Sequence, residues 1–264
     1  SFLRRGTERA DSNGGRPVVL LGGTLSPGAG RGLAAELSRT GVEVVGSIPG
    51  SRIGELPPLG EGTVVAVMDP NLTSAAAVAE RRGATVVKTL MPIGVDGTAR
   101  FVQDVAEEAG SRISEVVRAR SAWEDLGALR NRIRGKRIFF TGDTGLEIPL
   151  ARFLADAGAV VLEVGAPRLD RRFLAAELQA LGPDVDVVVS PDYRGQTDRI
   201  DESRPDVVIS SPGLHLPLVA RGHLCRSPRD FIAAGLYGYG GSRRILELLV
   251  RTMERAENLD SLNL

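Results

Sequence analysis

Short apolar runs alternate along the chain with longer stretches in which apolar residues recur at helical spacing. Val18–Leu21 is an unbroken apolar run that ends in two glycines, which is typical of a buried parallel strand followed by a turn. Residues 33–37 then carry helical spacing, and Gly41 marks the predicted end of that helix. The same pattern predicts further strands at 42–48, 63–67 and 85–87, and a helix that runs from a cap at Asn71 to Arg82.

The alternation pauses in the middle of the chain and then begins again. Residues 98–134 carry Arg, Glu and Ala at helical spacings, which predicts a mainly helical segment. Beyond it the pattern predicts strands at 137–140, 160–164, 185–189 and 207–210, helices at 146–157 and from the Asp170 cap to 181, and an amphipathic terminal helix at 243–257.

These elements predict an α/β fold with two doubly wound, Rossmann-like parallel-sheet domains joined by a helical linker. We expect a flexible tail at 1–16, a first domain at 17–110, the linker at 111–135, and a second domain with a C-terminal helix at 136–264. A chain of 264 residues is long enough for two such domains and for cores that need no disulfide or structural metal.

Composition and charge argue against several classes of protein. With 33 Lys+Arg against 33 Asp+Glu, the formal net charge is zero, which argues against bulk electrostatic binding to nucleic acid or to an anionic membrane. No unbroken apolar stretch approaches the length of a membrane span, and residues 1–17 lack the apolar run of a signal peptide, so we expect a cytoplasmic protein. The single cysteine, Cys225, excludes internal disulfides and a metal site built from cysteines of this chain alone.

The glycine-rich turn at 22–32 follows the first predicted strand, where a phosphate-binding turn would lie. It lacks the spacing of a dinucleotide fingerprint, and Pro27 removes one backbone donor. A plain flexible turn is therefore favoured, and an enzyme that binds a dinucleotide or a nucleotide sugar is the alternative. A Walker A motif is absent, because Gly135-Lys136 is followed by Arg137.

The turn at 141–149 occupies the corresponding place in the second part of the chain. Asp143 and Glu147 follow a predicted strand at the edge where open α/β sheets place ligands, so they are candidate binding residues. The alternative is that Asp143 or Thr144 only caps the next helix. Nothing in the sequence fixes the pKa values that would make this pair a proton-transfer pair.

Two histidines flank a loop rich in arginine and glycine. His215 and His223, together with Cys225, do not match the usual spacing of metal ligands. A surface or interface loop is the favoured interpretation.

One long segment and several short ones form an ordered set along the chain. The longest is GKRIFFTGDTGLEIPLARFL at 135–154, and the shorter ones are MPIGVDGT at 91–98, EVGAP at 163–167, LAAEL at 174–178, RPDVV at 204–208, GLHLPLVARG at 213–222 and YGYGG at 237–241. Together they resemble the N subunits of light-independent protochlorophyllide reductase, which are relatives of the nitrogenase α-subunit. The resemblance spans about residues 17–250 and implies a nitrogenase-subunit-like fold.

The resemblance implies an oxidoreductase subunit that is active only within a complex. In this family, N and B subunits form a heterotetramer, a 4Fe-4S cluster lies between N and B, and a separate ATP-dependent iron–sulfur protein delivers electrons. The complex reduces protochlorophyllide to chlorophyllide without light, a step of chlorophyll and bacteriochlorophyll biosynthesis in photosynthesis. The implied partners are the B-type catalytic subunit, the iron–sulfur protein and a tetrapyrrole substrate, with no nucleic acid and no membrane span.

The candidate binding residues lie at strand ends that face the cleft between the two domains. They are Gly142, Asp143, Glu147, Gly94, Gly97 and Thr98. We identify no catalytic residue. We expect the chain to match the C-terminal two-thirds of a family subunit, without the domain that carries the cluster-ligating cysteines. Cys225 matches none of those ligands, so no metal ligand is expected in this segment.

The chain departs from the family after residue 222. Residues 226–228 are Arg-Ser-Pro where the family has Lys-Trp-Ser, so an aromatic residue is lost. Two alternatives therefore accompany the main hypothesis. One is a subunit of chlorophyllide reductase or of another nitrogenase-like tetrapyrrole reductase, and the other is a divergent binding or scaffold module without a cluster.

Overall fold

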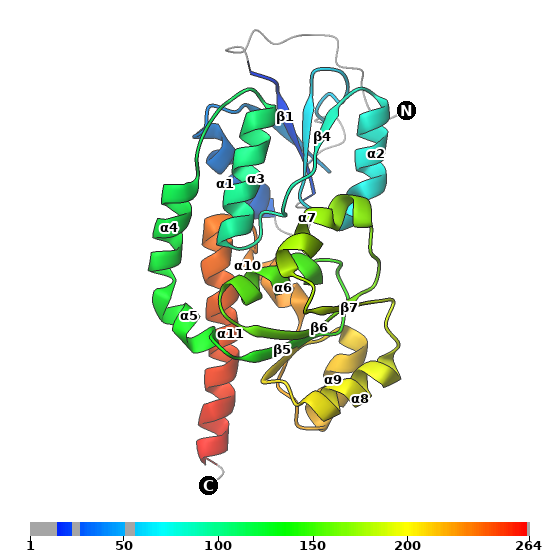
Figure 1. The fold of residues 1–264 in the computed structure, drawn as a ribbon, viewed down its shortest axis with the longest axis vertical. Coiled ribbons are helices and arrows are strands. Elements are labelled where there is room, and N and C mark those ends of the chain that lie inside the picture. Colours follow the sequence, from blue (N-terminus) through cyan, green and yellow to red (C-terminus); the bar gives the residue numbers. More distant parts are fainter. Residues whose placement is uncertain (1–14, 23–26, 51–55, 263–264) are drawn as a thin grey trace.

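The computed structural model describes residues 15–22, 27–50 and 56–262 and contains two parallel β-sheets stacked along the long axis of the molecule (Figure 1). The first sheet has the spatial order β2-β1-β3-β4, with β1 (Val18–Leu21), β2 (Val44–Ile48), β3 (Val64–Val67) and β4 (Thr85–Val87). The second has the order β7-β6-β5-β8-β9, with β5 (Arg137–Phe140), β6 (Val160–Ala166), β7 (Asp186–Val189), β8 (Val207–Ile209) and β9 (Cys225–Arg226). The predicted α/β fold with two parallel sheets is confirmed.

Helices cover both faces of the first sheet. Val18 and Leu20 face a core shared with α1 (Pro27–Ser38) and α3 (Val95–Glu108), and Val19 faces a second core that includes α2 (Thr73–Arg81). Successive side chains of a strand point to opposite faces, so a strand buried on both faces needs an unbroken apolar run, as β1 has. We call β1–β4 with α1–α3 the first half.

The second sheet is covered in the same way. α6 (Glu147–Asp156) and α7 (Arg171–Leu181) pack on the face that carries Phe140, whereas α8 (Tyr193–Ser203) and α9 (Pro212–Ala220) pack on the face that carries Phe139. We call β5–β9 with α6–α9 and α10 (Pro228–Ala234) the second half. The sequence pattern did not predict α8, α9, α10 or β9, because α8 is mostly polar, α9 is apolar on every side, and α10 and β9 are short.

The long C-terminal helix packs against both halves. α11 (Gly238–Leu262) contacts α1 and α3, and also α10 and α5 (Gly127–Ile133), and it runs down the side of the molecule to the C-terminus (Figure 1). It begins at Gly238, several residues before the predicted start at 243, because its first turn tolerates three glycines. The domain boundaries expected from the sequence, at 16/17, 110/111 and 135/136, stay a prediction. In the described ranges, no helix combines the length and the hydropathy that crossing a membrane requires.

The start of α2 differs from the prediction. Asn71 was expected to cap it, but Asn71 lies within a 3-10 turn, η2 (Pro70–Leu72), and the cap of that turn is Asp69. The Asp69 carboxylate accepts a hydrogen bond from the Asn71 backbone N–H at 2.8 Å. By contrast, the predicted cap of α7 is confirmed, since the Asp170 carboxylate accepts from the Arg172 N–H at 3.1 Å.

Candidate functional site

The carboxyl edges of the two sheets face each other. Asn71, which follows β3, donates from its side-chain amide to the carbonyl oxygen of Thr144, which follows β5, at 2.7 Å. The Tyr237 hydroxyl donates to the carbonyl of Met68 at the end of β3, at 3.2 Å. The carboxyl edge of an open α/β sheet is where ligands bind. The turns of both halves that the sequence singled out therefore lie where the carboxyl edges of the two sheets meet, and we call this region the junction.

The backbone of the turn after β5 packs closely against β6. Gly142 has φ +84°, and a Cβ at this position would lie 2.7 Å from the carbonyl oxygen of Gly165 in β6, so only glycine fits. The next residue, Asp143, pairs with Arg229, with Arg229 Nε and Asp143 Oδ2 3.1 Å apart. Asp143 is therefore a carboxylate held at the junction by an exposed arginine.

The Glu147 side chain accepts hydrogen bonds from the backbone of this turn. Its Oε1 accepts from the backbone N–H groups of Asp143 and Thr144, both at 2.7 Å, and from the Thr144 hydroxyl at 3.0 Å. The side chain is 1% exposed, and Oε2 is buried without a hydrogen-bond partner. Neither Asp143 nor Thr144 caps α6, whose N-cap residue is Leu146. Glu147 thus supports the turn through its backbone, and the Asp143 carboxylate has a different partner, Arg229.

The candidate turn in the first half packs directly against α6. Gly94 has φ +77°, and a Cβ there would lie 2.3 Å from the Phe153 ring. A Cβ on Gly97 would lie 2.3 Å from Arg152 Nη2. The Thr98 hydroxyl donates to the Gly94 carbonyl at 2.6 Å and is fully buried. The structure therefore gives Gly94 and Gly97 a packing role between the halves, whereas Thr98 bonds within its own segment. Ligand binding by the six candidate residues stays a prediction.

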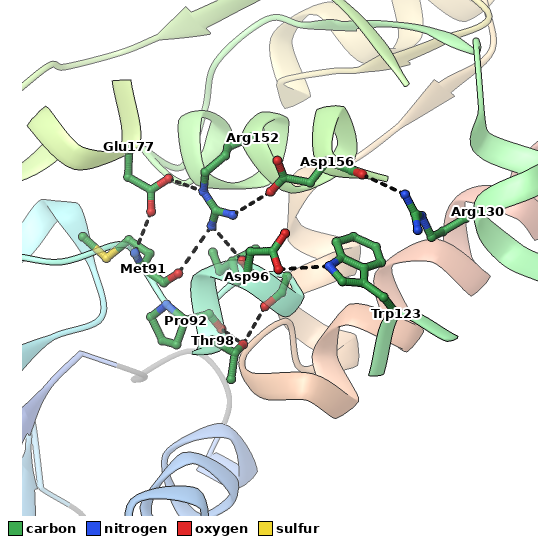
Figure 2. Close-up of polar contacts among 11 residues, drawn as sticks. Met91, Pro92, Asp96, Thr98, Trp123, Arg130, Arg152, Asp156 and Glu177 are labelled. Atoms are coloured by element: carbon green, nitrogen blue, oxygen red, sulfur yellow. Dashed lines mark hydrogen bonds and ion pairs between the residues drawn. The ribbon is translucent and has the colours of Figure 1, made fainter. Parts of the chain in front are cut away.

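The junction contains a buried ion pair that the sequence did not reveal. Arg152 Nε donates to Glu177 Oε2 at 2.7 Å, and the side chains are 1% and 0% exposed (Figure 2). The backbone of the first half completes the network, because the Met91 N–H donates to Glu177 Oε1 at 2.5 Å and Arg152 Nη2 donates to the Ile93 carbonyl at 2.7 Å. Burial raises the pKa of Glu177, and the charge of Arg152 opposes that shift.

The network continues toward the surface (Figure 2). Arg152 Nη1 pairs with Asp156 Oδ2 at 3.1 Å, and burial raises the pKa of Asp156 to about 6 although the charge of Arg152 acts in the opposite direction. The indole N–H of Trp123 donates to Asp96 Oδ1 at 2.9 Å, and the Arg130 guanidinium lies 4.4 Å from the centroid of the Trp123 ring. In the sequence, Arg152 and Glu177 are charged residues at positions of α6 and α7 where the helical pattern calls for an apolar residue, and this is the signal that could have revealed them.

The described residues do not fit the iron–sulfur cluster that the resemblance implies. They contain no group of three or more His, Cys, Asp or Glu side chains placed to hold a metal ion. Burial raises the pKa of the Cys225 thiol to about 11, which disfavours the thiolate that would bind iron. The histidines have other partners, since His215 Nδ1 lies 2.8 Å from the Ser210 hydroxyl and His223 Nε2 lies 2.7 Å from Asp201.

The predicted turn at 22–32 lies partly outside the described residues, which omit 23–26. Within the described part, Gly22 has φ +127°, and a Cβ on it would lie 3.0 Å from the Asp69 side chain. The Gly22 N–H donates to the Ile48 carbonyl at 2.8 Å. Gly22 therefore allows β1 to end in close contact with the segment that follows β3.

Comparison with known proteins identifies relatives over almost the whole chain. The light-independent protochlorophyllide reductase subunit N of Roseiflexus sp. (strain RS-1) is 40% identical over 248 residues, which cover 94% of this chain and 59% of the relative. The corresponding subunit of Chloroflexus aurantiacus is 37% identical over 246 residues, covering 93% of this chain and 55% of the relative. The chain thus spans a little over half the length of the curated relatives it matches.

The fold is similar to that of a solved nitrogenase. The structure described as nitrogenase Cp1 at pH 6.5 superposes with a TM-score of 0.70 at 17% sequence identity, over 96% of this chain and 62% of the other. The model of the family described as nitrogenase component 1 type oxidoreductase matches residues 2–254. The chain therefore belongs to the nitrogenase component 1 type oxidoreductase family.

Proposed function

We propose that this chain is part of an N-type subunit of a nitrogenase-like reductase that reduces a tetrapyrrole, with protochlorophyllide as the substrate and chlorophyllide as the product. The reaction is ATP-dependent and independent of light. The subunit works in the cytoplasm, in a heterotetramer with the B-type catalytic subunit, and receives electrons from an ATP-dependent iron–sulfur protein.

One observation carries this proposal: subunits of this name are 37–40% identical over 93–94% of the chain. The fold is consistent with it, because two parallel sheets with facing carboxyl edges are similar to the nitrogenase structure. In this proposal the 4Fe-4S cluster belongs to the assembled complex, and the described residues contain no group of three or more His, Cys, Asp or Glu placed to hold a metal ion.

The proposed role of this segment is to shape and hold the site. Asp143 is paired with Arg229, and Glu147 is engaged by the turn it supports, so neither is a free acid or base in the structure. The Arg152–Glu177 pair fixes the segment at 91–93 against the second half. Such an arrangement orients groups at the junction between the halves, and the redox chemistry comes from the cluster when the complex is assembled.

The test is anaerobic co-purification of the full-length protein with a co-expressed B-type subunit, followed by iron analysis and titration with protochlorophyllide. The proposal expects iron in the amount of one 4Fe-4S cluster per heterodimer and a saturable shift of the pigment absorbance. A shift with chlorophyllide and none with protochlorophyllide would instead identify a chlorophyllide reductase subunit. A stable complex without iron would identify a binding or scaffold module, and the proposal would be wrong.

A further inference from the structure

A cavity of about 650 Å³ lies at the outer side of the junction between the halves. Its walls come from all three parts of the chain: Asp96 from the start of α3, the linker helices α4 (Val116–Asp125) and α5, and Asp156 from the end of α6. A cavity of this volume lies within the range of small-molecule sites. It is distinct from the turn at 141–147 that the sequence singled out.

The linker that forms most of this cavity is basic. Residues 111–135 contain six arginines and three carboxylates, although the whole chain has a formal net charge of zero. Three of these arginines line the cavity: Arg120, Arg130 and Arg134. Three carboxylates also line it, from Asp96, Glu124 and Asp156, so what the cavity can bind depends on which of these charged groups already have partners.

Several side chains in the cavity walls carry hydrogen-bond donors that have no acceptor among the described residues. The side chains of Arg120, Asn131 and Arg134 make no hydrogen bond or ion pair within the described part of the chain. Arg130 donates weakly to the Asp156 carbonyl, at 3.4 Å, and its Nε is buried without an acceptor. The donors that a ligand can reach are therefore those of Arg120, Asn131 and Arg134, whose side chains are exposed.

The acids in the walls do not use these donors. Asp96 accepts from Trp123, and Asp156 pairs with Arg152 below the cavity. Glu124 is exposed and makes no hydrogen bond or ion pair with the described residues. The unused capacity of the cavity therefore consists mainly of guanidinium and amide N–H groups, which are complementary to an anion.

We propose that this cavity binds a small organic anion with two or more carboxylate or phosphate groups. Arg120 and Arg134 would each take one anionic group, since a guanidinium presents paired N–H donors to carboxylate or phosphate oxygens. Stacking on Trp123 does not contribute, because Arg130 covers one face of its ring and Phe153 lies against it with the ring centroids 6.0 Å apart. Recognition is by charge and hydrogen bonding.

Because of the position of the cavity, anion binding is linked to the packing of the two halves. Its walls join the first half, the linker and the second half, and the Asp96–Trp123 bond already ties the first half to the linker (Figure 2). A ligand that binds only the folded arrangement stabilises it by mass action. The anion therefore links occupancy of the cavity to the relative placement of the halves, independently of the proposed tetrapyrrole reaction.

The chain carries its own probe for this site, because Trp123 is its single tryptophan and lines the cavity. The experiment titrates the purified chain with citrate and, separately, with inorganic pyrophosphate at constant ionic strength, and follows the tryptophan emission. We expect a saturable change with at least one of the two probes, and an apparent Kd that is about tenfold weaker in Arg134→Gln. A response to citrate alone identifies a carboxylate site, and a response to pyrophosphate alone a phosphate site.

The matched control is Arg132→Gln. Arg132 lies in the last turn of α5, two residues before Arg134, and carries the same charge, but its guanidinium pairs with Glu254 and Glu257 of α11 and does not line the cavity. The control is expected to bind both probes like the parent chain. The proposal is overturned if neither probe gives a saturable change, or if Arg132→Gln weakens binding as much as Arg134→Gln. Since both arginines are exposed, circular dichroism is expected to show the parent fold in both variants.

Discussion

Arg152 and Glu177 form an ion pair that is almost completely removed from solvent, with Nε and Oε2 2.7 Å apart. Both residues also bond to the backbone of the first half, at Met91 and Ile93, so the pair connects two helices of the second half to a segment that lies far away in the sequence. Its remaining polar atoms are therefore satisfied, which is the condition under which a buried charge pair is tolerated. Removing one partner leaves the other charge buried.

The first prediction concerns this pair. Arg152→Met leaves the Glu177 carboxylate buried without its cation and is expected to lower the free energy of unfolding by about 3–5 kcal/mol. The double variant Arg152→Met/Glu177→Leu removes both charges and is expected to recover part of that loss. Urea unfolding followed by circular dichroism measures both. A double variant less stable than Arg152→Met would contradict the argument that the unpaired charge is the main cost.

The second prediction uses two glycines that both have a positive φ. Gly94 and Gly110 have φ +77° and +94°, but a Cβ on Gly94 would collide with Phe153, whereas a Cβ on Gly110 meets nothing within 4 Å. Gly110→Ala is expected to lose about 1 kcal/mol from backbone strain, and Gly94→Ala about 3 kcal/mol, because the collision adds to the strain. Equal losses in thermal unfolding would show that the two halves do not pack as closely at Gly94 as the structure indicates.

The fold could be predicted because its strands and helices have local signals. β1 and β3 are buried on both faces, which requires unbroken apolar runs, and Asp170 lies directly before α7, where a short acidic side chain accepts from the helix N–H groups. α9 gave no such signal. It is apolar on every side although Leu216 is 75% exposed, so no period distinguishes its buried face.

The candidate site was less predictable because its contacts join distant residues. The glycines at 94, 97 and 142 could be recognised as special, but the reason for each is a neighbour from another element, such as Phe153 or Gly165. A charged residue among apolar ones, as Arg152 is, marks a buried partner without saying which residue it is. A single sequence carries the signals of periodicity and helix capping, but it does not specify which of several carboxylates pairs with a given arginine.

The third prediction concerns the turn after β5. Glu147→Ala removes the carboxylate that accepts from the Asp143 and Thr144 N–H groups, and is expected to lower stability by about 1–3 kcal/mol. Amide hydrogen exchange at Asp143 and Thr144 is expected to become faster in that variant, whereas Glu147→Gln keeps an acceptor and protects both amides better. Asp143→Asn, which only weakens the pair with the exposed Arg229, serves as the control and is expected to change stability by less than about 1 kcal/mol. Unchanged exchange in Glu147→Ala would mean that the carboxylate does not hold the turn.

The fourth prediction is a pH dependence that arises from Asp156. Its pKa is raised from 3.8 to about 6 in the folded protein because burial outweighs the attraction of Arg152, so the native state binds this proton more tightly than the unfolded chain does. The resulting stabilisation is complete below pH 3.8 and is lost as the pH rises through about 6. Asp156→Asn removes this titration, and Glu177, whose pKa is also raised, is present in both proteins and cancels in the comparison. The Tm of the parent chain relative to that of Asp156→Asn is therefore expected to fall between pH 4 and pH 7, a range that begins just above the unfolded pKa of 3.8 and ends above the folded pKa of about 6. Parallel Tm profiles would show that Asp156 titrates alike in the folded and unfolded states, and a difference that rises with pH would show that its carboxylate is stabilised by Arg152 more than it is destabilised by burial.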